Sequence, residues 1–491
     1  MNRTYIYILE RSRRRKGLSV MSGKRSFKKD LVTVMISNCV VLLGNVVTGF
    51  IVPKMLGVTE YGYYKIFTLY LGYVSLLHFG FVNGILIEYA GKEYDEIDKE
   101  RMRAKTVFFM RLEIFISLLA AILAAILIGP LYRYIMILLG LDIFAVNLTA
   151  YFQNVSQSTS RFKELSFRKV LLAISKLALA ALLYFAIKID LIPRATADYY
   201  VTGLVIIDFI LTIWYIITYK EIVFGTRVAF SSEKESIIQC FKTGIILMVC
   251  FQVNHLIFNL DRQFVSVLFD TNTYSVYSFA YHLISMITTI INAVALVLFP
   301  TLKKKKVDDI VESYTDSVGL VSIVALGALI GFYPFKVLIQ VILPEYIGSI
   351  DYLRVILPGL VLSCCINIIM FTYYKALDKH VRFCIISCLV LAFAAVSNYL
   401  AYTLFKTPMA ISVASILTLT VWYFASDYFF SKHYGTKWKK NAIYIICLMG
   451  TFYILSQLIH NDLLFVIIYA VAYMLMTFVM HKKLIVHYIK R

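Results

Sequence analysis

The stretch Pro53-Lys54-Met55-Leu56-Gly57-Val58-Thr59-Glu60-Tyr61-Gly62-Tyr63-Tyr64-Lys65 joins two apolar segments, each long enough to cross a membrane. Segments and turn occupy residues 31–90, and a second unit of the same design occupies residues 241–300. The second turn reads Asp270-Thr271-Asn272-Thr273-Tyr274-Ser275-Val276-Tyr277. Aligning Tyr61 with Tyr274 also aligns Tyr64 with Tyr277 and Val52 with Val265. The matches fall at equivalent points of two hydrophobic halves, the internal repeat on which many transporter folds are built.

Composition places the chain in a membrane. Hydrophobic residues make up 60% of the sequence, charged residues 16%, and the mean hydropathy is +0.77. A soluble domain is far less apolar, so the solvent for this surface must be lipid. The apolar runs are continuous and do not alternate with polar residues, which excludes a β-barrel. The sequence therefore predicts an all-α polytopic membrane protein.

At about 20 apolar residues per crossing, the sequence predicts about fourteen transmembrane helices. The segment 317–342 contains Pro334 and Lys336, so a split or re-entrant helix is an alternative there. The predicted spans are 31–52, 66–89, 106–129, 132–155, 168–187, 199–218, 241–268, 275–299, 317–342, 353–376, 382–404, 408–430, 441–459 and 462–480.

The distribution of Lys and Arg predicts the orientation. These residues concentrate in the N-terminal tail, in every even-numbered connection, including Lys303 to Lys306, and in the C-terminal tail. Cytoplasmic loops carry such an excess, so both termini are expected in the cytoplasm. The net charge of +20 is explained by this topology and by anionic lipid headgroups, with no need for a nucleic-acid partner.

The spans group into two pseudo-repeated halves. We expect a basic cytoplasmic N-terminal tail (1–30), an N-terminal six-helix lobe (31–218), a cytoplasmic linker (219–240) and a C-terminal six-helix lobe (241–430). Two further helices and a basic tail occupy residues 431–491.

The sequence lacks the motifs of disulfide pairing, metal binding and nucleotide hydrolysis. The eight cysteines form no CxxC pair and no Cys/His cluster, so neither a disulfide nor a metal site is expected. No GxxxxGK[ST] motif is present, and no loop is long enough for a nucleotide-binding domain. We therefore expect no catalytic residue, no enzymatic activity and no cofactor, and any transport would draw on an H⁺ or Na⁺ gradient.

Ionisable residues inside apolar spans are the candidate functional residues, because each is costly in lipid. Asp142, Lys176 and Asp208 lie near the middle of three N-terminal spans and are candidates for ion coupling, with a structural ion pair as the alternative.

The pair Asp261-Arg262 interrupts a long apolar run about two turns below the outer surface. With His255 and His282 nearby in sequence, and Lys54 and Lys65 at the matching turn, it predicts a cationic cavity that binds substrate. The alternative is that Arg262 only neutralises Asp261 or extends to the surface.

The turn resembles a known signature. Pro53 to Gly57 followed by Glu60 to Tyr64 is similar to the R-x-L-G-x-x-x-(Y/F)-G-x-Y motif of bacterial polysaccharide flippases, in the multidrug/oligosaccharidyl-lipid/polysaccharide exporter superfamily. Lys54 stands where Arg is usual, which keeps the charge but loses bidentate phosphate geometry. Further segments resemble that family's landmarks: His78 to Gly84, Asn259 to Arg262, Tyr274 to Ala280, Leu298 to Pro300 and Leu343 to Tyr346.

The resemblance implies a flippase of the bacterial cytoplasmic (inner) membrane. Such proteins move undecaprenyl-pyrophosphate-linked oligosaccharides from the inner to the outer leaflet by alternating access, for O-antigen, capsule or other surface polysaccharides. Membrane lipid, this lipid-linked oligosaccharide and other polysaccharide-assembly membrane proteins are then the expected partners. Two alternatives stay open: a drug/cation exchanger of the same superfamily, and a membrane polysaccharide polymerase or ligase. The sugar, the polymer, the coupling ion and the oligomeric state are open as well.

Overall fold

The computed structural model describes residues 3–159, 161–302, 306–377, 379–459 and 461–489. Of the predicted cytoplasmic run Lys303 to Lys306, the first three residues lie outside the described part. Every regular element in the described part is a helix. The α-helices are α1 (Arg3–Leu71), α2 (Phe81–Glu88), α3 (Lys99–Leu127), α4 (Pro130–Ser158), α5 (Phe162–Lys188), α6 (Ala197–Thr218), α7 (Phe230–Leu268), α8 (Thr271–Leu302), α9 (Val307–Gly327), α10 (Phe332–Ile342), α11 (Ser349–Ile356), α12 (Gly359–Cys364), α13 (Phe371–Ala376), α14 (His380–Phe405), α15 (Pro408–Tyr434), α16 (Lys439–Leu458) and α17 (Asp462–Ile489).

The predicted fold class is confirmed. Among the described residues, twelve helical segments are long and apolar enough to cross a membrane. One of them, Ser37–His78, has 42 residues, which would extend about 63 Å as a straight helix, twice the hydrocarbon thickness. It contains two crossings, because its helix is broken at Gly57. Counting these two arms separately and adding α8 gives fourteen segments of the described chain that could cross a membrane. The segment Val307–Ile342 is one crossing with a 3-10 turn inside it.

The backbone of Gly57 breaks α1 at the first predicted turn. Its φ of 72° and ψ of 176° separate a first arm of α1 (residues 37–56) from a second arm (residues 58–71). The predicted turn over 53–65 is therefore too long, because Pro53 to Leu56 and Val58 to Lys65 are helical. The predicted second turn shortens in the same way to Phe269 and Asp270. Hydrogen bonds from Thr273 to the Asp270 carboxylate begin α8 and lower the pKa of that carboxyl group.

Replacing Gly57 with alanine is expected to destabilise the protein. The region near φ 72°, ψ 176° is essentially restricted to glycine, and a side chain there costs about 1–3 kcal/mol. We expect a lower thermal unfolding midpoint for Gly57→Ala in detergent. Gly450→Ala is the control, because Gly450 lies inside α16 and no atom lies within 4 Å of an added Cβ. Equal midpoints for Gly57→Ala and the unmodified protein would contradict this role.

The second crossing is broken near its middle. After α1 ends at Leu71, a 3-10 turn occupies Val74–His78, and Gly80 has a φ of 82° before α2 begins. A Cβ on Gly80 would lie 2.5 Å from the carbonyl carbon of Gly244 on α7. Only glycine allows this approach of the two backbones, so α2 packs tightly on the first part of α7.

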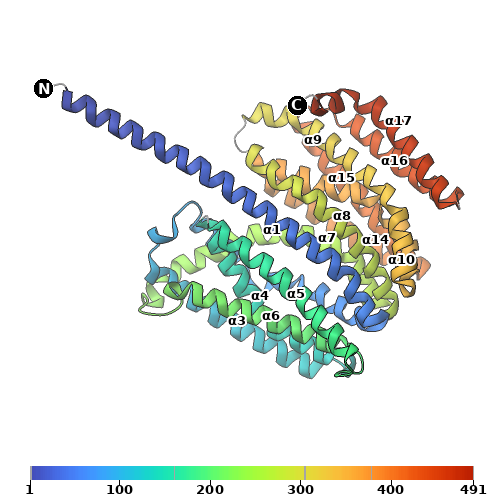
Figure 1. The fold of residues 1–491 in the computed structure, drawn as a ribbon, viewed down its shortest axis with the longest axis horizontal. Coiled ribbons are helices and arrows are strands. Elements are labelled where there is room, and N and C mark those ends of the chain that lie inside the picture. The colour runs from blue at the N-terminus through green and yellow to red at the C-terminus, as the bar shows by residue number, and fades with distance from the viewer. Residues whose placement is uncertain (1–2, 160, 303–305, 378, 460, 490–491) are drawn as a thin grey trace.

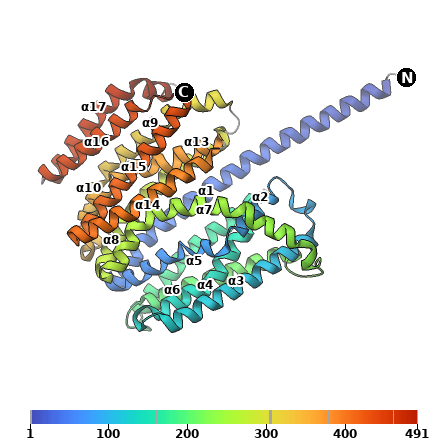
Figure 2. The same cartoon turned by 180° about the vertical axis from the view of Figure 1, so that it is seen from behind.

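Figures 1 and 2 show the helices in two groups, with α3 to α6 on one side and α8 to α15 on the other. The central helices cross between the groups. The first arm of α1 lies along α8, where Gly49 faces His282, and the second arm and α2 lie along α7, where Gly72 faces His255. α16 and α17 pack on α9 at the edge of the second group. That each group moves as a rigid lobe stays a prediction.

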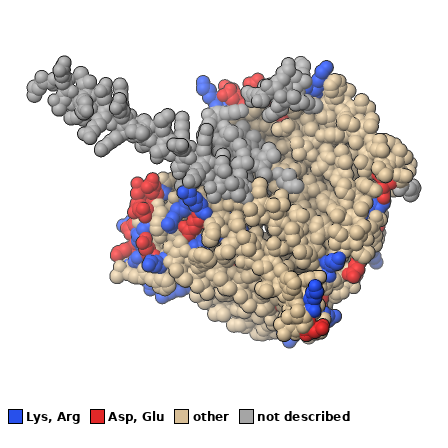
Figure 3. Space-filling model, viewed as in Figure 1, with Lys and Arg blue, Asp and Glu red and all other residues tan. Residues whose placement is uncertain are grey.

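The surface matches a lipid environment. Figure 3 shows charged side chains at opposite margins of the molecule, with a broad uncharged band between them. Leu and Ile side chains on α3 and α14, such as Leu127 and Leu389, are exposed. In water this area of apolar surface would aggregate, whereas lipid solvates it.

Candidate functional site

Three adjoining cavities run from the boundary between the two groups into the second group. The N-half cavity, about 270 Å³, lies beside both arms of α1, α5 and α8. The junction cavity, about 120 Å³, lies between the second arm of α1, α7 and α8. The C-half chamber, about 420 Å³, is enclosed by α7, α8, α11, α12 and α15. The junction cavity shares Lys65 with the N-half cavity and Arg262 with the C-half chamber, so the three form a series.

The lining is cationic. Lys65 borders the N-half and junction cavities, and its ammonium lies 5.1 Å from the ring centre of Tyr61 and 5.4 Å from that of Tyr64. Arg262 and His255 border the junction cavity and the C-half chamber. None of the described residues that line the three cavities is Asp or Glu. Such a cavity attracts anions, because no carboxylate offsets the positive charge.

Asp261 forms no ion pair within 4.0 Å with the Arg262 guanidinium. The Asp261 side chain is buried, and it accepts hydrogen bonds from the Tyr277 hydroxyl at 2.8 Å, from the Tyr281 hydroxyl and from the backbone N–H of Arg262. The Arg262 guanidinium instead donates to the Phe258 carbonyl at 2.9 Å and lies 4.7 Å from the ring centre of Tyr281. Asp261 thus orients Tyr281, and Tyr281 supports Arg262 at the cavity wall.

Lys54 is separated from the other predicted substrate-binding residues. Its side chain is exposed, and it lines none of the three cavities, whereas Lys65, His255 and Arg262 meet at the junction cavity. The reason is helical geometry, since Pro53 and Lys54 continue the first arm of α1 and neighbouring residues point to different faces. His282, noted in the sequence only as a neighbour, lines the N-half and junction cavities.

The ion-coupling candidates lie together in the N-terminal group. Asp142 on α4 is fully buried, and neither carboxylate oxygen has a hydrogen-bond partner in the described part of the chain. Asp208 on α6 and Lys176 on α5 lie within electrostatic reach of it. Among the described residues, no ion pair within 4.0 Å joins Lys176 to either carboxylate. Lys176 also lines the N-half cavity.

Sequence reasoning missed a polar stripe along α8. Its members recur at intervals of three and four residues along the helix, which places them on one face. All of them line the junction cavity or the C-half chamber: Tyr274, Ser278, Tyr281, Ser285 and Thr288. This spacing was visible in the sequence and is the signal that identifies the cavity face of the helix.

At the predicted outer end, the central helix α1 is in contact with α8 of the second group. The Thr59 hydroxyl donates to the side-chain carbonyl of Asn272 at 2.8 Å, and the Tyr274 hydroxyl donates to the Lys65 carbonyl at 3.2 Å. A Cβ on Gly62 would lie 2.6 Å from the Thr271 carbonyl oxygen, so the absence of a side chain lets α1 and α8 meet.

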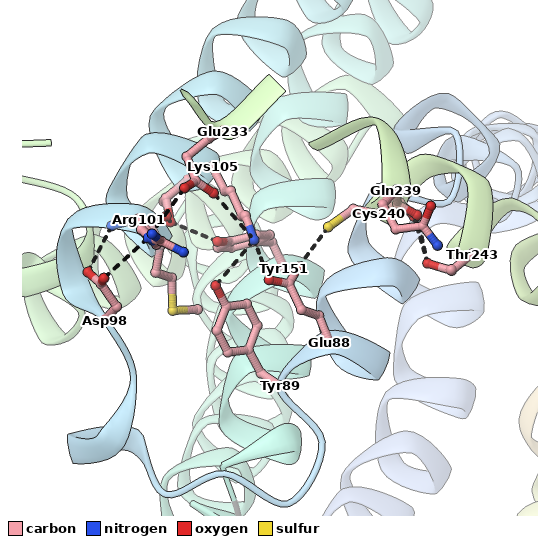
Figure 4. Close-up of polar contacts among 12 residues, drawn as sticks. Glu88, Tyr89, Asp98, Arg101, Lys105, Tyr151, Glu233, Gln239, Cys240 and Thr243 are labelled. Atoms are coloured by element: carbon pink, nitrogen blue, oxygen red, sulfur yellow. Dashed lines mark hydrogen bonds and ion pairs between the residues drawn. The ribbon is translucent and has the colours of Figure 1, made fainter. Parts of the chain in front are cut away.

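At the predicted cytoplasmic end, a buried lysine joins α2, α3 and α7 (Figure 4). Lys105 on α3 pairs with Glu88 of α2, and its ammonium nitrogen lies 3.9 Å from a carboxylate oxygen of Glu233 on α7. The Cys240 thiol donates to Glu88 at 3.0 Å, and Arg101 lies 3.6 Å from Glu233. The Lys105 side chain is only 2% exposed, so removing it would leave Glu88 without its cationic partner, whereas Glu233 would keep Arg101.

Comparison with known proteins identifies the family. Residues 27–306, more than half of the chain, match the model of a family described as polysaccharide biosynthesis protein. No curated protein matches the chain in sequence. A solved structure of the lipid II flippase MurJ in an inward closed conformation is similar, with a TM-score of 0.67, 13% identity, and coverage of 92% of this chain and 99% of that chain.

Two further solved structures share the fold. One is a MOP superfamily transporter from Pyrococcus furiosus, described as having a binding pocket of reverse polarity, with a TM-score of 0.56, 11% identity and coverage of 83% of this chain and 96% of that chain. The other is an outward-facing MATE family transporter, with a TM-score of 0.54, 13% identity and the same coverage of 83% and 96%. The resemblance carried by Pro53 to Tyr64 is thus confirmed. The chain belongs to the polysaccharide biosynthesis protein family, as a multi-pass membrane protein with the fold of MOP-superfamily flippases and transporters.

Proposed function

We propose that the protein is a flippase for a lipid-linked oligosaccharide. It carries an undecaprenyl-pyrophosphate-linked sugar unit from the inner to the outer leaflet of the bacterial cytoplasmic membrane, for assembly of a surface polysaccharide. Both termini lie in the cytoplasm, as the loop charges predict, and the two groups of helices open alternately to the two sides.

The observation that carries this proposal is the carboxylate-free, cationic junction cavity. A pyrophosphate cannot cross hydrocarbon unaided, because its charge is strongly hydrated. Lys65 and Arg262 face one cavity from two different halves of the chain, so an anion between them would be held by both. The aromatic rings of Tyr61, Tyr64 and Tyr281 that flank these cations favour the same site.

The two alternatives are less well supported. An exchanger of cationic drugs needs acidic groups at its binding site, whereas the described lining of the three cavities is positive. A polymerase or ligase would place its reaction in a large outer loop, and the predicted outer connections in the described chain are short.

Reconstitution distinguishes these functions. In vesicles, a fluorescent undecaprenyl-pyrophosphate-linked N-acetylhexosamine is quenched from outside by dithionite, and the protected fraction reports its movement between leaflets. We expect the protein to abolish protection of the inner-leaflet pool. Efflux of ethidium without movement of the lipid would instead establish the exchanger. If the vesicles show neither lipid movement nor ethidium efflux, the proposal is refuted.

Gradient coupling is proposed to act through Asp142. Its buried, unpartnered carboxylate lies within reach of Asp208 and Lys176, so binding of H⁺ or Na⁺ would change the charge balance of this group. We expect Asp142→Asn to retain basal movement of lipid but lose acceleration by an imposed gradient in the vesicle assay. The control is Asp190→Asn, which makes the same change in the turn between α5 and α6 and should leave gradient-dependent transport unchanged. Gradient-dependent transport that survives both Asp142→Asn and Asp208→Asn would remove these residues from coupling.

A further inference from the structure

The C-half chamber differs in chemistry from the two cavities beside it. Its volume is about 420 Å³ against about 120 Å³ for the junction cavity, and its one Arg or Lys, Arg262, and its one imidazole, His255, are both shared with that cavity. The rest of its described lining is neutral. The polar members that the junction cavity does not share are amides and hydroxyls: Thr288, Thr289, Ser363, Asn367 and Ser415; Asn259 lines both.

These polar groups are available to a ligand. The hydroxyls of Thr288 and Ser363 donate to carbonyls one helical turn earlier, at 2.9 and 3.1 Å, which leaves their oxygens free to accept. Asn259 donates its amide to the His255 carbonyl at 2.7 Å, so its side-chain carbonyl remains an acceptor. The Asn367 carboxamide has no hydrogen-bond partner among the described residues and offers two donors and an acceptor.

Backbone geometry singles out Asn367. It lies in a π-helical turn, Cys365–Met370, between α12 and α13. Such turns are rare and frequently occur at functional sites, because the extra residue redirects a side chain. Phe258 adds an aromatic surface to the same chamber, and Trp422 packs against it with ring centres 5.1 Å apart.

We propose that the C-half chamber is the sugar subsite, and that it takes an uncharged hexose or N-acetylhexosamine. This inference rests on the proposed function. With the pyrophosphate held at Lys65 and Arg262, the first sugar, which is bonded directly to it, extends past Arg262 into the chamber. Neutral amides and hydroxyls beside an aromatic face suit the hydroxyls and apolar face of a sugar. Asn367 and Asn259 are then the specificity residues.

The test measures how much the sugar adds to binding. The full chain in nanodiscs is titrated with bare undecaprenyl pyrophosphate and with the same lipid bearing glucose, galactose or N-acetylglucosamine. We expect the unmodified protein to bind at least one sugar-bearing lipid about 10-fold more tightly than the bare lipid, the gain of one or two hydrogen bonds. Asn367→Leu should remove this difference and leave the Kd of the bare lipid unchanged.

Three controls make the outcome decisive. Asn259→Leu should also reduce the difference, and it replaces Asn367→Leu if that variant does not fold. Asn398→Leu makes the same change on α14, outside the chamber, and should retain the difference. Arg262→Ala should weaken bare and sugar-bearing lipids alike. No sugar-dependent gain in the unmodified protein, or a gain that survives Asn367→Leu and Asn259→Leu, overturns the sugar subsite while the pyrophosphate site stands. Failure to bind any of the four lipids refutes the proposed function itself.

Discussion

Replacing Arg262 with alanine is expected to abolish export of the lipid-linked unit while the protein still inserts and accumulates. The guanidinium lines the junction cavity and the C-half chamber, and no carboxylate neutralises it there. Charge-assisted hydrogen bonds of this kind contribute about 1.5–3 kcal/mol, or about 10- to 140-fold in affinity. Lipid-linked units should therefore build up on the cytoplasmic side, measured by extraction and chromatography. Arg262→Lys should recover part of the activity, because a point charge replaces the planar fork.

Two lysine variants, one inside the junction cavity and one outside it, form a matched control for the Arg262 experiment. Lys65→Ala removes the second cation of the junction cavity and should reduce export strongly, whereas Lys54→Ala removes an exposed cation outside the cavities and should not. The double variant Asp261→Asn/Arg262→Gln tests the structural alternative. Because the Asp261 carboxylate bonds to Tyr277 and Tyr281 and not to the guanidinium, we expect no rescue. Normal export by the double variant would remove Arg262 from the substrate site.

Linking Thr59 to Asn272 is expected to stop transport completely and reversibly. The two side chains are hydrogen-bonded at 2.8 Å, and they belong to α1, a central helix between the two groups, and to α8 in the second group. Alternating access requires this contact to open, so a covalent bridge would hold it closed. With the native cysteines replaced by alanine, Thr59→Cys/Asn272→Cys is treated with a short bifunctional methanethiosulfonate. Lipid movement in vesicles should fall to background and return when a reductant is added.

A bridge within one group is the control for this experiment. Tyr134 on α4 is exposed and Thr202 on α6 is half-buried, and their hydroxyls lie 2.9 Å apart within the N-terminal group. Tyr134→Cys/Thr202→Cys carries the same reagent near the same end of the molecule, but the bridge should leave transport intact. If the Thr59–Asn272 bridge forms fully and transport continues, the outer ends of α1 and α8 do not separate during the cycle.

The fold could be predicted largely from sequence because hydropathy and loop charge are local properties. Twenty apolar residues in a row need no tertiary information to be recognised as a crossing, and the count of fourteen followed from them. The predicted turns are too long, because glycines and tyrosines are spread over residues 53–65 while the break in the helix is confined to Gly57. Tyrosine and single glycines do not end a helix, and only the backbone of Gly57 leaves the helical region there.

The sequence by itself determined the fold class, the family signature and the presence of costly charges within apolar spans. The tertiary structure alone decided which of those charges share a cavity. Lys65 and Arg262 lie far apart in sequence yet line the same cavity, while Lys54, eleven positions from Lys65, is exposed outside it. It also decided that the Asp261 carboxylate bonds to two tyrosines, while the Arg262 guanidinium bonds to the Phe258 carbonyl. The physical reason is rotation about the helix axis: sequence gives the depth of a residue in the membrane, but its direction depends on how neighbouring helices pack.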